Sequence, residues 1–365
     1  MRFYTRQHTY YCGIDLHTRM MFICILDERG DIVLQRNTFA KPKSFLTVIE
    51  PFKDGLVVAA ECMFTWYWLA DLCEREGIPF VLGHALYMKA IHGGKTKNDR
   101  IDAHKIAVLL RGGMFPLAHV YPKQKRSTRD LLRRRTHFMR KRAELLAHVQ
   151  NTSWQYRLEP IGRRLANRKG HETVPILFDD TFVRSSVEAD LELVGYYDGV
   201  IKRLEWQLTK QAWIDDRPNY DLLRSIPGVG KVLALILLYE IDDIRRFGSV
   251  QQFCSYCRLI RPPKTSAGKP AGLPSHKKIG NAHLKWAISE AALLLLRESK
   301  DVKRYVERLR QKHNKGKALG ILSHRLGRAL YYILLHTPPQ GVLRRKDLPE
   351  DDLSEFIGPD AELGV

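Results

Sequence analysis

The first third of the chain alternates between runs with the two-residue period of strands and runs with the longer period of helices. Strands are predicted where apolar residues alternate or run together, at 10–16, 20–26, 32–39, 56–61 and 79–82. Helices are predicted between and after them, at 44–52, 64–75 and 99–111. Three consecutive strands followed by alternating helices and strands predict an α/β unit, a mixed sheet covered by helices.

The rest of the chain is predicted to be helical. Apolar residues with the 3-4-3-4 spacing of a coiled-coil seam occur at Val187, Val194, Tyr197, Ile201, Leu204 and Leu208. Long helices on either side of 160–180 would form a hairpin, and its seam fits a second subunit and its own domain equally well. A second helical unit begins near Tyr220.

With 365 residues, 44% of them hydrophobic, the chain can form two or three domains with cores of their own. The predicted parts are 1–118, 119–216, 217–340 and an acidic, mobile tail at 341–365. The first residues lack a secretory signal pattern, and no apolar run approaches the roughly 18 residues of a membrane span. We therefore expect a cytoplasmic protein. In that compartment Cys254 and Cys257 favour a packing role over zinc binding, because no second Cys or His pair lies near them.

Lysine and arginine outnumber aspartate and glutamate by 60 to 40, which gives a formal net charge of +20. The acidic tail offsets part of the excess, so residues 1–340 carry +24. Ten basic residues and one acidic residue lie between Lys123 and Arg142, and residues 244–289 contain no carboxylate. Such an excess indicates a polyanionic partner, in the first place nucleic acid. The expected contacts are Arg126, Arg133, Arg134, Gly228, Gly230, Lys231, Arg261, Lys264, Lys269, Lys277 and Lys278.

Four carboxylates lie where charge is hard to explain structurally. Asp15 follows apolar residues in the first strand, and Glu61 ends a buried one. Asp99 and Asp102 are three residues apart and share one helix face. Several carboxylates can hold two Mg²⁺ ions, or Mn²⁺ in their place, in the arrangement that cleaves phosphodiesters. A helix cap or a salt bridge is the alternative for any one of them.

Two glycine-containing segments in the second helical unit favour phosphate binding. Residues 225–230 read Ser-Ile-Pro-Gly-Val-Gly, the form of a helix-hairpin-helix turn, although a plain interhelical turn fits as well. Residues 261–281 are rich in Pro, Gly and Lys, and a serine among such cations could attack a phosphate. Composition does not separate Ser266 from Ser275.

Short motifs in a fixed order over residues 10–335 resemble the DEDD-type insertion-sequence transposases, the bridge-RNA-guided recombinases. They are Gly13-Ile14-Asp15, Ala60-Glu61, Lys97-Asn98-Asp99-Arg100-Ile101-Asp102-Ala103, Ile226-Pro227-Gly228-Val229-Gly230, Ser266-Ala267-Gly268 and Lys278-Ile279-Gly280-Asn281-Ala282-His283-Leu284. One departure lies after the fourth strand, where many members have Glu-Ala-Thr-Gly and this chain has Glu61-Cys-Met-Phe-Thr65.

The resemblance implies a RuvC-like domain with an RNase H fold, a coiled-coil middle and a helical transposase domain. It maps the metal-binding carboxylates to Asp15, Glu61, Asp99 and Asp102, and the nucleophile to Ser266. It further implies a bridge RNA that pairs with donor and target double-stranded DNA, a phosphoserine intermediate, and a dimer or tetramer with composite active sites. Such elements are prokaryotic, so association with the nucleoid is expected when the protein is active.

Two other functions fit the residues alone. A RuvC-like junction nuclease would use the four carboxylates and water, and would form no covalent adduct with DNA. A non-catalytic scaffold would bind nucleic acid through the same basic residues, and metal would change nothing. Ser266 distinguishes the recombinase from the nuclease.

Overall fold

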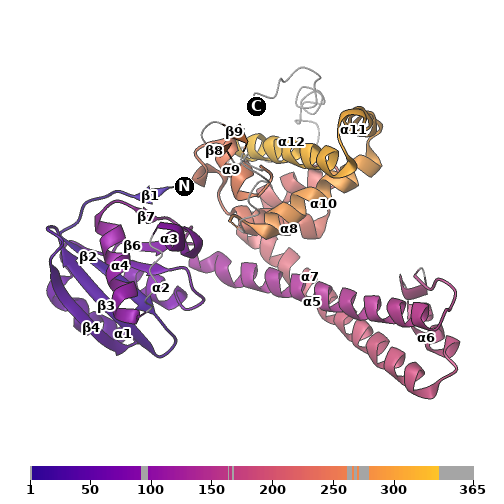
Figure 1. Ribbon diagram of the computed structural model, residues 1–365, viewed down its shortest axis with the longest axis horizontal. Coiled ribbons are helices and arrows are strands. Elements are labelled where there is room, and N and C mark those ends of the chain that lie inside the picture. Colours follow the sequence, from indigo (N-terminus) through magenta and orange to yellow (C-terminus); the bar gives the residue numbers. More distant parts are fainter. Residues whose placement is uncertain are drawn as a thin grey trace. The chain divides into compact units, whose positions relative to one another are not determined.

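The computed structural model describes residues 2–91, 98–162, 164–166, 168–260, 265–266, 269–270 and 279–336. Its chain divides into two compact units, Met1–Lys123 and Gln124–Val365 (Figure 1). The first boundary falls five residues after the predicted one, and the finer divisions at 216/217 and 340/341 stay predictions.

The first unit is built on a mixed five-stranded sheet with the strand order β4-β3-β2-β5-β6. Its strands are β2 (Tyr10–Leu16), β3 (Met20–Asp27), β4 (Ile32–Phe39), β5 (Leu56–Glu61) and β6 (Phe80–Gly83). Strands β2, β3 and β4 form an antiparallel meander, while β5 and β6 run parallel to β2. The predicted mixed sheet is therefore confirmed. Residues 56–60 of β5 are all buried, as expected for an apolar strand that lies inside a sheet.

Helices cover both faces of this sheet. One face packs against α1 (Pro42–Ile49) and α2 (Tyr67–Arg75), with Cys12, Ile14 and Leu16 in the shared core. The other face packs against α4 (Asp99–Arg111), with Tyr11, Val57 and Ala59 in the core. The shorter elements of the unit are β1 (Phe3–Tyr4), a 3₁₀ turn at Glu50–Phe52, α3 (Ala85–Ile91) and β7 (Phe115–Pro116).

The second unit begins with a helical hairpin (Figure 1). Its long helices are α5 (Lys123–Gln155) and α7 (Thr181–Ser225), joined through α6 (Arg168–Thr173) and two 3₁₀ turns at Arg164–Ala166 and Pro175–Leu177. Two ion pairs link them, Arg135 with Glu205 and Arg142 with Asp198 at 2.6 Å, and His148 forms a hydrogen bond of 2.5 Å with Asp190. Residue numbers rise along α5 as they fall along α7, so the two helices are antiparallel.

The heptad seam is used within this chain. Val187, Val194, Ile201 and Leu208 of α7 are buried, whereas Tyr197 and Leu204 are partly exposed. Val187 lies in the core near the hairpin end, and Leu208 lies in the core that also contains Leu132 of α5. Part of the seam thus packs inside its own domain, and its pairing with a second subunit stays a prediction. Farther along, α7 bends at Asp216, whose backbone is not helical, two residues before Pro218.

The remaining helices enclose the largest apolar core. They are α8 (Lys231–Ile241), α9 (Val250–Tyr256), α10 (Ala282–Glu298), α11 (Lys300–Lys312) and α12 (Lys315–His336), with a 3₁₀ turn at Ile244–Arg246 and a strand pair, β8 (Thr265–Ser266) and β9 (Lys269–Pro270). Helix α8 is buried from Leu233 to Ile241, and Glu240 is the one charged residue in that span. Cys254 and Cys257 are buried free thiols in this core, in agreement with a packing role. Within the described residues, none of these helices is both long and apolar enough to span a bilayer.

Candidate active site

Two of the predicted carboxylates lie at the carboxyl ends of neighbouring parallel strands. The register of β2 and β5 pairs Gly13 with Ala59 and Ile14 with Ala60, so Asp15 and Glu61 are the next residues on each strand. Alternation along a strand puts them on the same face as Tyr11 and Ala59, which is the face covered by α4. Strand geometry therefore directs both acids toward α4.

Helix α4 lies directly on β2 because residue 13 is glycine. A methyl group there would lie 2.3 Å from the carbonyl oxygen of Ala103 and 2.4 Å from the amide nitrogen of Ala107. The helix starts at Asp99, where the Asn98 side chain accepts a hydrogen bond from the Arg100 amide at 2.9 Å. This close contact brings the first turn of α4, with Asp99 and Asp102, to the end of β2.

A histidine joins the carboxylates at this point. His17 Nε2 lies 3.4 Å from Asp15 Oδ2 and 3.6 Å from Asp99 Oδ1. One ligand atom from each of these residues falls within 4.8 Å of the other two, a separation that a single metal ion can bridge. Asp102 contacts Lys105, with 3.5 Å between Oδ1 and Nζ. Thr65, beside the altered motif, donates a hydrogen bond to the Leu16 carbonyl at 3.1 Å.

The electrostatics of Asp15 indicate an incomplete balance of charge. Burial raises the pKa of its carboxyl, and Asp99 and Asp102 raise it further, while the nearby His17 opposes them. Oxygen ligands of this kind suit Mg²⁺ or Mn²⁺, and a divalent cation would relieve the repulsion among the acids. The donor set therefore fits a divalent metal.

The sequence analysis identified Asp15 and Asp99 but missed His17. The structure brings these three together, places Asp102 close enough to affect the pKa of Asp15, and sets Glu61 on the adjacent strand. His17 follows Asp15 by two residues, the spacing that returns a side chain to the same face of an extended chain. That spacing was the signal available in the sequence.

Comparisons with known proteins indicate the family to which the chain belongs. Residues 12–154 match the IS110-type DEDD transposase family, and residues 220–307 match the family described as "Transposase IS116/IS110/IS902 family". The "Transposase for insertion sequence element IS1111A" of Coxiella burnetii (strain RSA 493 / Nine Mile phase I) is 23% identical over 295 residues, which cover 79% of this chain and 78% of that protein.

The chain belongs to the IS110-type DEDD transposases. The resemblance in the sequence is thus confirmed, and the protein is an enzyme that cleaves DNA and transfers strands. The DEDD domain implies an RNase H-like fold, with which the mixed sheet and its flanking helices agree.

Of the serine segment of this transposase, the structure describes two backbone pairs. Ser266 in β8 pairs with Lys269 in β9, and Thr265 pairs with Pro270. The side chains of these residues, and Arg261, Lys264, Ser275, Lys277 and Lys278 as a whole, lie outside the described residues. The choice of Ser266 therefore stays a prediction.

The glycine turn before α8 serves packing at one position and is open at another. Gly228 has a φ of +81°, and a methyl group there would lie 2.6 Å from the Ala291 carbonyl oxygen. Gly230 precedes α8 with open space around it, and Lys231 is exposed in the first turn of that helix. The structure thus gives Gly228 a role in the contact between helices, while phosphate binding at Gly230 and Lys231 stays a prediction.

The predicted arginine contacts of α5 differ in their surroundings. Arg126 is 5% exposed, and the Arg133 guanidinium binds the Glu240 carboxylate through two hydrogen bonds of 2.7 Å and 3.0 Å. Arg126 is thus enclosed and Arg133 is paired within the protein, and nucleic-acid binding by these two stays a prediction. Arg134 is exposed and lies over the Phe138 ring at 4.9 Å.

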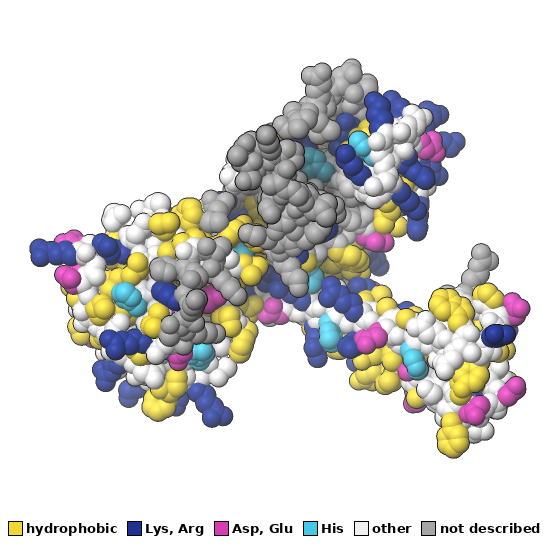
Figure 2. Space-filling view, viewed as in Figure 1, with side chains coloured by type: hydrophobic (Ala, Val, Ile, Leu, Met, Phe, Trp, Pro, Cys, Tyr) yellow, Lys and Arg dark blue, Asp and Glu magenta, His cyan; other side chains and the backbone are white. Residues whose placement is uncertain are grey.

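A basic surface that the sequence analysis missed lies on α11. Figure 2 shows Lys and Arg side chains gathered over this helix. Its exposed cations are Lys300, Lys303, Arg304, Arg308, Arg310 and Lys312. Val302, Tyr305 and Val306 face the core, so the helical period separates an apolar face from a basic one.

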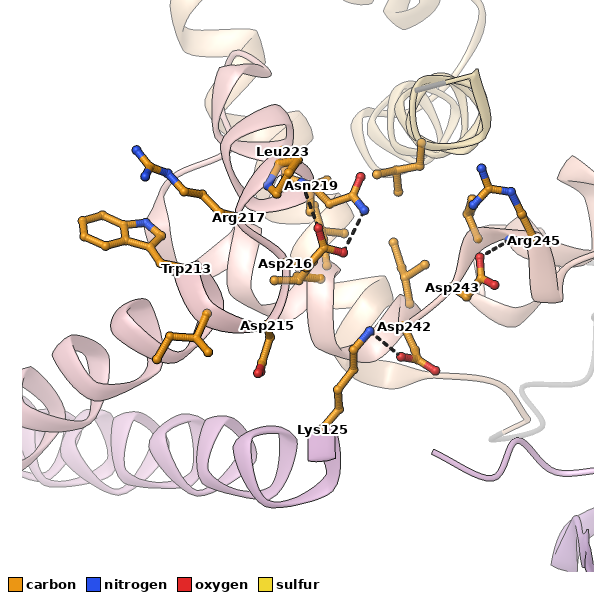
Figure 3. A pocket seen from close by; sticks show the side chains of 17 residues that line it. Lys125, Trp213, Asp215, Asp216, Arg217, Asn219, Leu223, Asp242, Asp243 and Arg245 are labelled. Carbon is orange, nitrogen blue, oxygen red and sulfur yellow. Dashed lines mark hydrogen bonds and ion pairs between the residues drawn. The ribbon is translucent and has the colours of Figure 1, made fainter. Parts of the chain in front are cut away.

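A separate pocket of about 520 Å³ surrounds the bend in α7 (Figure 3). Four aspartates line it, each with a hydrogen-bond partner: Asp215 with Tyr239, Asp216 with Asn219, Asp242 with Lys125 and Asp243 with the Arg245 amide. None of the predicted site residues lines the pocket, and its carboxylates are explained by the fold.

Proposed function

We propose that this transposase exchanges strands between donor and target DNA under the guidance of a structured RNA, through a phosphoserine on Ser266. The observation that carries the proposal is the contact of α4 with β2 over Gly13, which gathers Asp15, Asp99 and His17 into a metal-binding arrangement. Family membership supports it, because a transposase must break and rejoin phosphodiester bonds.

The carboxylates of Asp15, Glu61, Asp99 and Asp102 would hold Mg²⁺, as two ions, with Mn²⁺ as the alternative. A bound divalent ion supplies Lewis acidity to phosphodiester cleavage. The nitrogen Nε2 of His17 is a further ligand within reach of Asp15 and Asp99. Asp15 is half-buried and lies on a strand of the sheet, so it would fix the position of the metal site.

In the covalent step, the Ser266 Oγ attacks a backbone phosphorus. The new Oγ–P bond forms as the bond from phosphorus to the leaving strand oxygen breaks; the hydroxyl proton leaves Oγ, and the leaving oxygen ends as a hydroxyl. In the second step, a strand hydroxyl from the other duplex attacks the phosphoserine and releases the serine. The two steps consume no oxidant or reductant.

The partners we propose are an element-encoded bridge RNA, donor and target double-stranded DNA, and further copies of this chain in a dimer or tetramer. Exposed cations such as Arg134, Lys231 and those of α11 would bind phosphates. Specificity would come from RNA–DNA pairing, as in other RNA-guided systems.

The test starts with co-expression of the protein and the non-coding DNA that flanks its gene, followed by sequencing of the bound RNA. The complex is then incubated with labelled donor and target DNA and Mg²⁺, and a denaturing gel reveals covalent protein–DNA adducts. We expect an adduct that Ser266→Ala abolishes while nucleic-acid binding is retained, with Ser275→Ala as the matched control. Full recombination by Ser266→Ala would refute the proposal.

A junction nuclease that uses only the metal site is the second candidate. The grouping of Asp15, His17 and Asp99 favours it, since a bound metal ion could activate water without a protein nucleophile. Metal-dependent cleavage without any adduct, in a complex with competent RNA and DNA, would support this alternative.

A further inference from the structure

A buried glutamate links three helices of the second unit. Glu240 of α8 is 1% exposed, and its carboxylate accepts hydrogen bonds from Arg129 Nε at 3.1 Å and from Arg133 Nε at 2.7 Å. Asn281, which precedes α10, donates to it from Nδ2 at 2.7 Å. Burial by itself raises the pKa of Glu240, but the hydrogen bond and charge of Arg133 and the charge of Arg129 lower it to about 2. The carboxylate is therefore ionised at neutral pH.

Asn281 is held from two sides. Its Oδ1 accepts hydrogen bonds from the amides of His283 at 2.8 Å and Leu284 at 3.2 Å, and so caps α10. Its Nδ2 donates to Glu240, and its backbone amide donates to the Tyr256 carbonyl at 2.6 Å. The side-chain amide of Asn281 thus has one orientation, with its oxygen toward α10 and its nitrogen toward Glu240.

The same region closes the base of the serine segment. Arg258, at the end of α9, donates from Nε at 3.0 Å and Nη2 at 2.7 Å to the carbonyl of Gly280. Gly280 has a φ of +93°, and a methyl group there would lie 2.5 Å from the Tyr256 carbonyl oxygen. These hydrogen bonds therefore hold the two ends of the serine segment, Arg258 and Gly280, next to each other. Ser266 lies between them in the sequence.

We infer that Glu240, acting through Asn281, is a positioning residue for the segment that carries Ser266. This inference rests on the proposed role of Ser266. Fold stability alone does not call for such a network, because well-packed apolar residues are often as stabilising as a buried ion pair. A charged acceptor bound by three residues instead specifies one arrangement of α5, α8 and the base of the segment. A displacement of about 1 Å at a reacting group can reduce a rate about 100-fold.

The test compares Asn281→Ser with Asn314→Ser in the full-length complex with its co-purified RNA. Serine keeps a cap oxygen at both positions, since Asn314 caps α12 through a 2.9 Å bond from the Lys317 amide. Only the change at 281 removes the donor to Glu240. We expect both variants to be folded at the assay temperature and to bind DNA equally, but adduct formation about 100-fold slower for Asn281→Ser. Equal adduct rates would overturn the inference.

A second test exchanges the carboxylate and the amide between positions 240 and 281. Recovery of the rate in this double variant could not be explained by a general loss of stability. Asn281→Asp keeps a cap oxygen but sets a second carboxylate against Glu240, and should also slow the reaction. Adding Glu240→Gln restores a hydrogen bond of opposite polarity, and we expect at least a tenfold recovery of the rate. No recovery would contradict the inference. Absence of an adduct in the wild type, or its persistence in Ser266→Ala, would instead refute the proposed function on which the inference rests.

Discussion

Gly13 is the position where one added methyl group should most disturb the metal site. Alanine there would place its Cβ 2.3 Å from the Ala103 carbonyl oxygen and 2.4 Å from the Ala107 amide nitrogen, both in the backbone of α4. Ordinary contact begins near 3.4 Å, so the helix and the strand must separate by about 1 Å. A backbone cannot rotate out of the way as a side chain can, and the shift passes to Asp99 in the first turn of α4.

We expect two measurable effects of Gly13→Ala. Overpacking at such a site costs about 1–3 kcal/mol, which urea unfolding of the metal-free protein measures. Displacement of Asp99 from Asp15 and His17 should weaken Mn²⁺ binding about 10-fold or more in titration calorimetry, as loss of ligand positioning does elsewhere.

Gly199→Ala is the matched control, because this glycine lies within α7 with no neighbouring atom in contact range. That change should leave Mn²⁺ binding unaltered and should slightly stabilise the helix. If Gly13→Ala unfolds and binds Mn²⁺ like the wild type, the close contact of α4 with β2 is not what assembles the site.

Three further predictions concern charged side chains. Asp15→Asn should raise the melting temperature in EDTA at pH 8, because a raised carboxyl pKa means that the ionised form destabilises the fold. The same change should abolish any stabilisation by Mn²⁺. A lower melting temperature in EDTA would contradict this prediction. His17→Ala should weaken Mn²⁺ binding about 10-fold in calorimetry, whereas unchanged affinity would exclude the imidazole as a ligand. Glu240→Gln should cost about 3 kcal/mol in urea unfolding at pH 7, since two arginines lose their buried countercharge. The pKa of Glu240 is lowered from 4.5 to about 2, so its stabilisation is present above pH 4.5 and is lost as the pH falls toward 2; an equal cost at pH 7 and pH 2.5 would refute this assignment.

The elements that sequence predicted well are those whose signals are local. Helix α4 spans Asp99–Arg111 as expected, because Asn98 caps its start and Gly112 follows its end. Three strands, β2, β4 and β5, also match their predicted bounds. Strands β2 and β5 are apolar and mostly buried inside the sheet, whereas β4 lies at its edge and has no buried residue. Helix α2 starts at Tyr67 and not at residue 64, because the chain turns after Glu61, where the Met63 amide bonds to the Glu61 carbonyl. The aromatic residues at 64–68 read as the start of the helix, but Phe64 is 79% exposed and lies outside it.

The candidate site was predictable only as far as its residues lie on neighbouring elements. Asp15 and Glu61 follow from the ends of adjacent strands, and Asp99 from the start of a helix. The role of Gly13 in joining them depends on which helix crosses which strand, which no local pattern contains. His17 lay at an informative spacing from Asp15, but it follows the strand end and so reads as a turn residue.

The basic helix α5 shows why a count of charges predicts a partner better than it predicts contacts. In the sequence, ten cations between 123 and 142 face one acid, and nucleic acid is the natural countercharge. In the fold, Arg135, Arg142 and Arg133 bind Glu205, Asp198 and Glu240, acids 56 to 107 residues away that no sequence window includes. Such pairing leaves the net charge of +20 unchanged but means that the unpaired positive charge lies elsewhere.

Helix α11 is where exposed cations remain in number, with Lys303, Arg308 and Arg310 on one side of a helix whose other side is buried. Phosphate contacts are therefore better sought on α11 than along α5, although α5 first drew attention to a nucleic-acid partner.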